Sequence, residues 1–215
     1  MWEIPNATTQ NLIQSLSLAS VVLDSDVYRD KMNQLITSGP YRKLKRDPTD
    51  RLCGKVVSQL LALNRAGDLD DETYRKLRPT SKQPPRIYGL PKIHKPGTPL
   101  RPIVSCVSSF AYGLSKHLAG ILSPMTGKTS NTVPNSTSFA EFVRGQCIGN
   151  HETLVSFDVE SLFTNVPIEG TCRVARQRLE GDPTLPDRSS LSPTSITVLL
   201  EFVLRSNYFL HEGTF

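Results

Sequence analysis

The chain has 215 residues, of which 38% are hydrophobic and 21% are charged, and its net charge is +5. This ordinary composition allows one large or two small soluble domains, and the lack of a long apolar run or a basic-then-apolar N-terminus argues against a membrane span or a secretory signal. The cysteines are far apart without a C-x-x-C pair, so we interpret them as reduced thiols of an intracellular protein and not as a zinc site or disulfide framework: Cys53, Cys106, Cys147 and Cys172.

Helices dominate the elements expected in the first eighty residues. After a polar extension, the pattern predicts a short strand at 21–24, a helix at 26–36, a helix at 50–63 and a shorter helix that ends before Pro79. In the longest of these, Leu52, Val56 and Leu60 recur at helical spacing and form one apolar face. Asp70 and Asp71 are suited to cap the short helix, so we expect a helical pair with a short turn.

The segment 82–102 contains six prolines and two glycines, a composition that excludes a helix or a central strand. A loop stiffened by proline loses less conformational entropy on ordering than a flexible loop does. Such a loop can hold Lys92, Lys95 and Arg101 toward a common anion, which suits the binding of a triphosphate. The alternative for each lysine taken alone is a solvated surface side chain.

In the second half of the chain, helices are expected at 111–122, from Ser138 onward, at 168–180 and from Pro193, and a hairpin begins at 208–215. Ser138 and Glu141 have the spacing of a capping box, which predicts the start of the second of these helices. Pro193 suits the first position of a helix, because its missing N–H group would have no intrahelical partner there.

The segment 154–167 has the order strand, acid, turn, helix. Leu154 to Phe157 is apolar and favours a short buried strand, Asp158 follows at its end, and Pro167 is placed to open the next helix. A carboxylate in that position needs a cation, a metal ion or solvent. A helix cap or a solvated turn residue is the alternative to a metal ligand.

The basic residues are unevenly distributed. No Asp or Glu occurs from Thr73 to Ala140, whereas the rest of the chain has 15 basic and 20 acidic residues, a net charge of −5. An acid-free basic span with interleaved aromatic, proline and glycine residues favours a polyanion such as nucleic acid or nucleotide phosphate over a solvated basic face. The span holds ten basic residues: Arg75, Lys76, Arg78, Lys82, Arg86, Lys92, Lys95, Arg101, Lys116 and Lys128.

The segment 154–167 also resembles motif A of reverse transcriptases. In that motif the first catalytic Asp ends a strand, a bulky aromatic residue lies five positions later and a Pro lies nine positions later. Asp158, Phe163 and Pro167 match these positions.

Two further stretches extend the resemblance to the Penelope-like group of retroelement reverse transcriptases. They are Tyr-Gly-Leu-Pro-Lys-Ile-His-Lys at 88–95 and Leu-Arg-Pro-Ile-Val-Ser at 100–105, and the wording at 156–167 is similar to this group as well. The similarity runs from about Val21 to the last residue. It departs from the family at 18–20, where Leu-Ala-Ser stands in place of the usual Lys and Gly.

The resemblance implies two-metal nucleotidyl transfer, in which two ions about 3.5–4 Å apart stabilise the attacking and leaving oxygens. Asp158 is then the first carboxylate ligand of Mg²⁺, and the carbonyl of Val159 is a supporting ligand. The two-Asp motif C and the Gly-rich motif B of this family do not occur in the sequence. Polymerisation by these residues alone is therefore not expected.

The resemblance also assigns nucleotide-binding residues. Phe163 would be the steric gate that leaves no room for a 2′-hydroxyl, and its alternative is an ordinary core aromatic. Arg101 and one lysine would grip the phosphates of the incoming deoxynucleoside triphosphate. The choice between Lys92 and Lys95 stays open.

The fold class implied is α+β, with a helix-rich fingers region and a partial palm of the right-hand reverse transcriptase fold, whose sheet is incomplete. The expected divisions are an N-terminal extension at 1–20, a fingers-like region at 21–150 and a partial palm at 151–215. Expected partners are an RNA template, a DNA primer and deoxynucleoside triphosphates at chromosomal DNA in the nucleus, without a membrane and with no implied oligomeric state. The alternatives are a non-catalytic nucleic-acid-binding remnant of a retroelement and a fragment that does not fold stably.

Overall fold

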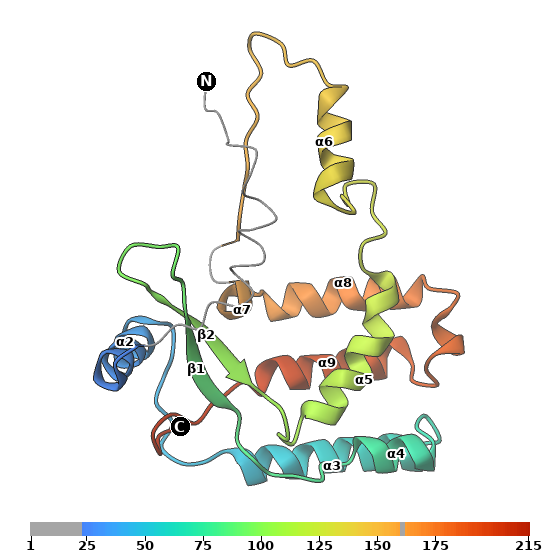
Figure 1. Ribbon diagram of the computed structural model, residues 1–215. Helices are drawn as coiled ribbons and strands as arrows, with labels where there is room; N and C mark the ends of the chain where they lie inside the picture. Colours follow the sequence, from blue (N-terminus) through green and yellow to red (C-terminus); the bar gives the residue numbers. More distant parts are fainter. Residues whose placement is uncertain (1–22, 160–161) are drawn as a thin grey trace. The chain divides into compact units, whose positions relative to one another are not determined.

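The computed structural model describes residues 23–159 and 162–215 (Figure 1). Within these residues the strands form a two-stranded antiparallel sheet, so helices and a small sheet together confirm the α+β class. No helix of the described part is long and apolar enough to cross a membrane. The elements in chain order are α2 (Ser25–Ser38), α3 (Thr49–Arg65), α4 (Asp71–Leu77), β1 (Arg86–Pro91), β2 (Leu100–Ser105), α5 (Tyr112–Leu122), η1 (Ser123–Met125), α6 (Ser136–Arg144), α7 (Leu162–Asn165), α8 (Ile168–Glu180), η2 (Leu185–Asp187) and α9 (Pro193–Arg205).

The chain divides into two compact units, each built from two stretches of sequence. Of the described residues, 23–42 and Ile87–Val104 belong to the first unit, and those of Lys43–Arg86 and Ser105–Phe215 belong to the second. The predicted extension at 1–20 and the first two residues of the strand expected at 21–24 lie outside the described residues. The predicted divisions at residues 20 and 150 stay predictions.

Helix α2 provides the long element of the first unit and confirms the helix expected at 26–36. Asp24 caps it, because its carboxylate Oδ1 accepts hydrogen bonds from the N–H groups of Asp26 at 2.9 Å and Val27 at 3.4 Å. Met32 is the buried residue of this helix, with a side chain that is 1% exposed. The helix ends at Gly39, whose backbone is extended.

The Pro-rich segment forms the β1–β2 hairpin, which packs on α2. A Cβ atom at Gly89 would lie 2.8 Å from the Met32 sulfur and 2.7 Å from Leu100 Cδ1, so only glycine permits this close approach. Both strands are edges of a two-stranded sheet, where Pro102 is tolerated. The predicted absence of a helix and of a central strand is therefore confirmed, and the loop expected there includes two edge strands.

The second unit is organised around a helical core (Figure 1). Helix α8 packs along α9, α5 packs on α9 and α4, and α4 packs on α3. The apolar faces expected from the helical spacing are the ones that are buried. They supply the core residues Leu52, Val56, Leu60, Leu114, Leu118, Ile121, Leu179, Ile196 and Leu199.

Local capping explains where several helices of the second unit begin. Asp70 caps α4 through Oδ1, which accepts from the Thr73 N–H group at 2.8 Å, as the sequence predicts. The capping box expected at Ser138 is wrong, because α6 begins two residues earlier. There Asn135 is the cap, and its Oδ1 accepts from the Ser138 N–H group at 2.9 Å, which leaves Ser138 inside the first turn.

The strand expected at Leu154 to Phe157 does not form. Residues 152–159 are extended between α6 and α7 without ladder hydrogen bonds (Figure 1). Leu154, Val155 and Phe157 are 68%, 69% and 91% exposed. A strand exists only through hydrogen bonds to a neighbouring strand, and none of the described residues supplies one to this segment. The apolar sequence alone therefore does not make it a strand.

The hairpin expected at 208–215 appears in its shortest form. An antiparallel bridge joins His211 and Thr214 across a tight turn, in which Glu212 and Gly213 have φ of 45° and 76°. Leu210 forms a parallel bridge with Arg86 at the beginning of β1. This end of the chain is further held by Tyr208, whose hydroxyl lies 2.7 Å from the Thr49 hydroxyl.

Candidate phosphate and metal site

The predicted phosphate ligands lie on one hairpin of the first unit, with Lys92 and Lys95 on its turn and Arg101 on β2. We call β1, β2 and the turn at 92–99 the basic hairpin. Successive backbone hydrogen bonds close the turn: Lys92 N–H donates to the Pro99 carbonyl at 2.9 Å, and Lys95 N–H donates to the Lys92 carbonyl at 3.0 Å. The positive φ of 72° at Gly97 completes it, a conformation that suits glycine. The turn is thus ordered by its own backbone.

Helix α2 supports the basic hairpin at two points, one on β1 and one on the turn. The Tyr28 hydroxyl accepts a hydrogen bond from the Gly89 N–H group at 2.8 Å, and the Lys31 ammonium donates to the Gly97 carbonyl. Sequence reasoning missed both residues. The signal that could have found them is their i, i+3 spacing, which places them on neighbouring positions of one helix face.

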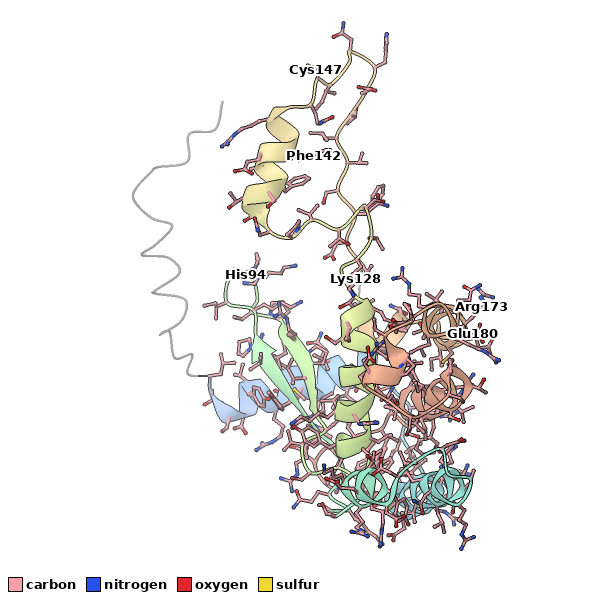
Figure 2. All side chains as sticks on the ribbon, turned by 90° about the vertical axis from the view of Figure 1, so that its right-hand side faces the viewer. His94, Lys128, Phe142, Cys147, Arg173 and Glu180 are labelled. Atoms are coloured by element: carbon pink, nitrogen blue, oxygen red, sulfur yellow. The ribbon has the colours of Figure 1, made fainter. Side chains whose placement is uncertain are left out.

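The three predicted cations have no acidic partners among residues 23–159 and 162–215. Lys95 and Arg101 are exposed and Lys92 is half-buried, and none of them forms an ion pair with a described residue. His94 lies beside them at the end of the hairpin (Figure 2). Ammonium and guanidinium groups form charge-assisted hydrogen bonds to oxyanions such as phosphate. A hairpin that presents several of these cations is therefore suited to bind a polyphosphate.

Two other cations of the acid-free span, Lys76 and Lys82, are paired with acidic residues. Lys76 binds Glu72 at 2.6 Å, and Lys82 binds Asp50 at 2.7 Å. The Glu72 carboxylate raises the pKa of Lys76, and the Asp50 carboxylate raises the pKa of Lys82. These two ammonium groups therefore have a carboxylate partner, and the described residues supply none to the hairpin cations.

The predicted metal ligand Asp158 belongs to the second unit. It lies on the extended segment before α7 and is exposed. Its Oδ1 accepts a hydrogen bond from the N–H group of Val159 at 2.8 Å, and Val159 is 60% exposed. Phe163 lies within α7, and its side chain is outside the described atoms. Pro167 precedes α8, as the sequence predicts.

Asp158 alone does not make a complete magnesium site. Residues 23–159 and 162–215 contain no group of three or more His, Cys, Asp or Glu side chains arranged to hold a metal ion. A pair of Mg²⁺ ions needs several carboxylate oxygens in addition to substrate phosphates. The described residues supply one such carboxylate here, so the two-metal expectation rests on the motif resemblance.

The predicted residues fall into two groups on different units. The structure brings together Lys92, Lys95 and Arg101 on one hairpin, and it places Asp158 and Val159 on one segment of the other unit.

A scan against models of known protein families finds no match, and searches of curated proteins and of solved structures find none either.

Proposed function

We propose that this chain forms the fingers and part of the palm of an RNA-directed DNA polymerase of the Penelope-like retroelement group. The resemblance of 88–95, 100–105 and 156–167 to that group supports the assignment. The observation that carries it is the basic hairpin, which α2 supports and whose three cations have no acidic partner among the described residues.

In this role the basic hairpin binds the triphosphate of an incoming deoxynucleotide. Arg101 supplies a planar guanidinium that can bind phosphate oxygens in pairs, and Lys92 or Lys95 supplies a second positive charge. Asp158 supplies a carboxylate to Mg²⁺, and Phe163 restricts the sugar. The template is RNA, the primer is DNA, and the reaction takes place in the nucleus.

Calorimetric titration with a deoxynucleoside triphosphate tests this function. Arg101→Gln is expected to weaken binding about tenfold, because a charge-assisted contact to phosphate is lost. The variants Lys92→Gln and Lys95→Gln identify which lysine takes part. Arg173→Gln is the matched control, since Arg173 is an exposed arginine of α8 without an ion pair in the described residues (Figure 2). Equal affinities of the Arg101→Gln and Arg173→Gln variants would overturn the assignment of the hairpin.

Primer extension tests the catalytic part of the assignment. The purified chain is expected to extend no primer, because the sequence contains one of the family's catalytic carboxylates and not the later pair. Mg²⁺-dependent synthesis that Asp158→Ala abolishes would contradict this expectation.

A second candidate is a nucleic-acid-binding remnant without polymerase activity. The acid-free span of ten basic residues supports it. This function predicts binding to RNA or DNA that weakens steeply with salt, because condensed counterions are released. Deoxynucleotide binding that depends on Arg101 separates the first candidate from the second.

A further inference from the structure

The turn of the basic hairpin contains a residue whose backbone conformation its own side chain disfavours. Thr98 has a φ of 45°, in the left-handed region, and it directly follows Gly97, which has a φ of 72°. Glycine adopts this region freely, whereas a β-branched residue such as threonine rarely does, because its Cβ substituents crowd the backbone. A strained residue of this kind persists only where the surrounding structure holds it in place.

Two hydrogen bonds hold the peptide group between Gly97 and Thr98. The Thr98 N–H group donates to the Lys95 carbonyl at 3.0 Å, which is a contact within the turn. The Gly97 carbonyl accepts from the ammonium of Lys31, which lies on α2, 66 positions earlier in the sequence. The carbonyl and the N–H group belong to the same planar peptide group, so the two bonds together fix its orientation. Lys31 thus stabilises the strained turn from outside.

The ammonium of Lys31 is well suited to this contact. Lys31 is half-buried, and it forms no ion pair with any residue of the described ranges. A hydrogen bond from a charged donor contributes more to stability than one between neutral groups. Its bond to Gly97 is therefore a strong candidate for what offsets the strain at Thr98.

The strands of the hairpin are supported separately from its turn. The Tyr28 hydroxyl accepts from the Gly89 N–H group of β1 at 2.8 Å, and Met32 packs closely against the same glycine. Removal of the Lys31 ammonium leaves both of these contacts intact. Its effect should therefore be confined to the turn at 92–99.

The turn that Lys31 stabilises carries two of the three cations proposed to bind phosphate. The Lys92 carbonyl accepts from the Lys95 N–H group at 3.0 Å, and the Lys95 carbonyl accepts from the Thr98 N–H group at 3.0 Å. This chain of hydrogen bonds links the conformation of Thr98 to the backbone of both lysines. A turn that is ordered only part of the time binds its ligand more weakly, in proportion to the ordered fraction.

We propose that Lys31 is a positioning residue of the deoxynucleotide site, which holds the strained Gly97–Thr98 peptide group so that Lys92 and Lys95 are in place to bind the triphosphate. This role rests on the function proposed above for the basic hairpin. Lys31 acts through the carbonyl of Gly97 and not by contact with phosphate.

Calorimetric titration with a deoxynucleoside triphosphate tests the effect on affinity. Lys31→Met is expected to weaken binding about fivefold, because the turn is ordered for a smaller fraction of the time. Lys31→Arg keeps a charged N–H donor for the Gly97 carbonyl and should stay within about twofold of the wild type. Lys55→Met is the matched control, since Lys55 is an exposed lysine of α3 without an ion pair in the described residues. Equal affinities of Lys31→Met and Lys55→Met would overturn the proposal.

The substitution Thr98→Asn separates positioning from direct contact with the ligand. Asparagine tolerates the left-handed region better than threonine does, so the turn should depend less on Lys31. In the Thr98→Asn background, Lys31→Met is expected to weaken binding by less than about twofold. If Lys31 bound phosphate directly, the loss of about fivefold would persist in this background, and that result would contradict a positioning role.

Amide hydrogen exchange without nucleotide tests the turn itself. The Thr98 amide should exchange about threefold to tenfold faster in Lys31→Met than in the wild type, and the Gly89 amide, which donates to Tyr28, should be unchanged. Unchanged exchange at Thr98 would overturn the proposal. A wild-type chain that binds no deoxynucleotide would contradict the function proposed for the hairpin, and the exchange at Thr98 would still decide whether Lys31 holds the turn.

Discussion

The basic hairpin and the segment around Asp158 both carry motifs of the family resemblance but differ in structural support. The hairpin has ladder hydrogen bonds and a closed turn, and two side chains of α2 bind its backbone. The Asp158 segment has an extended backbone, and Asp158 Oδ1 bonds only to the neighbouring Val159 N–H group among the described hydrogen bonds. The proposed phosphate-binding hairpin is therefore ordered in a chain whose proposed metal-ligand segment is unpaired within the described residues.

The difference teaches what each motif needs from the rest of the chain. A hairpin brings its own partner strand, so its geometry follows from a short stretch of sequence and one supporting helix. A buried strand that ends in a carboxylate depends on neighbours from distant sequence. Without them its apolar side chains are exposed, as Phe157 is at 91%.

The largest expected effect comes from exchanging a packed side chain of the hairpin's unit for alanine. Met32→Ala should lower the free energy of unfolding by about 3 kcal/mol, because a buried side chain in contact with the hairpin leaves a cavity. Phe157→Ala should change it by less than about 0.5 kcal/mol, because that ring is exposed. Urea denaturation measures both, and a large loss for Phe157→Ala would show that the segment is packed.

Two glycine substitutions should have opposite signs. Gly89→Ala is expected to destabilise the chain by about 2 kcal/mol, because the new methyl group would overlap Met32 and Leu100. Gly54→Ala in α3 meets no atom within 4 Å and should stabilise it by about 1 kcal/mol, since alanine favours a helix. Equal effects of the two variants in urea denaturation would contradict the close packing of α2 on the hairpin.

A smaller effect on stability is expected at Asp182, whose carboxylate is ion-paired, than at the packed side chains, and none is expected at Asp158. In the second unit Arg188 binds the Asp182 carboxylate and also donates through Nε to the Ile121 carbonyl at 2.9 Å. The side chains of Arg188 and Asp182 are 17% and 15% exposed. The hydrogen bond from Arg188, followed by those from Thr184, lowers the pKa of Asp182 from 3.8 to about 2.

The lowered pKa of Asp182 predicts how stability depends on pH. The ionised carboxylate stabilises the folded chain fully above pH 3.8, and this contribution is lost as the pH falls from 3.8 to about 2. Asp182→Asn should therefore lower the melting temperature at pH 7, and its difference from the wild type should vanish near pH 2. Asp158→Asn, at an exposed carboxylate without an ion pair among the described residues, should leave the melting temperature at pH 7 unchanged.

Local sequence patterns predicted most of the helical part of the fold. The spacing of Leu52, Val56 and Leu60 predicted α3, and Asp70 predicted the start of α4, because helix periodicity and capping involve residues a few positions apart. The cap of α6 was missed because Asn135 stands three residues before Ser138 and satisfies its N–H group first.

Non-local pairing explains what the sequence could not predict. The strand expected at 154–157 would need a neighbouring strand from elsewhere in the chain, and a local sequence pattern cannot predict whether one is present. The support of the hairpin by Tyr28 and Lys31 spans more than sixty positions. The predicted roles of Arg101, Lys92, Lys95, Asp158, Val159 and Phe163 come from the motif resemblance and remain predictions.

Amide hydrogen exchange with and without a deoxynucleoside triphosphate and Mg²⁺ tests the central claim most directly. The amides of Gly89 and Lys92, which donate to Tyr28 and Pro99, should be protected in the free chain, and the nucleotide should add protection across 92–101. Residues 153–158, whose N–H groups donate no hydrogen bond within the described structure, should exchange freely in both states. Protection of 153–158 in the free chain would contradict the unpaired state of that segment. A nucleotide that leaves the exchange of 92–101 unchanged would contradict the proposed phosphate site on the hairpin.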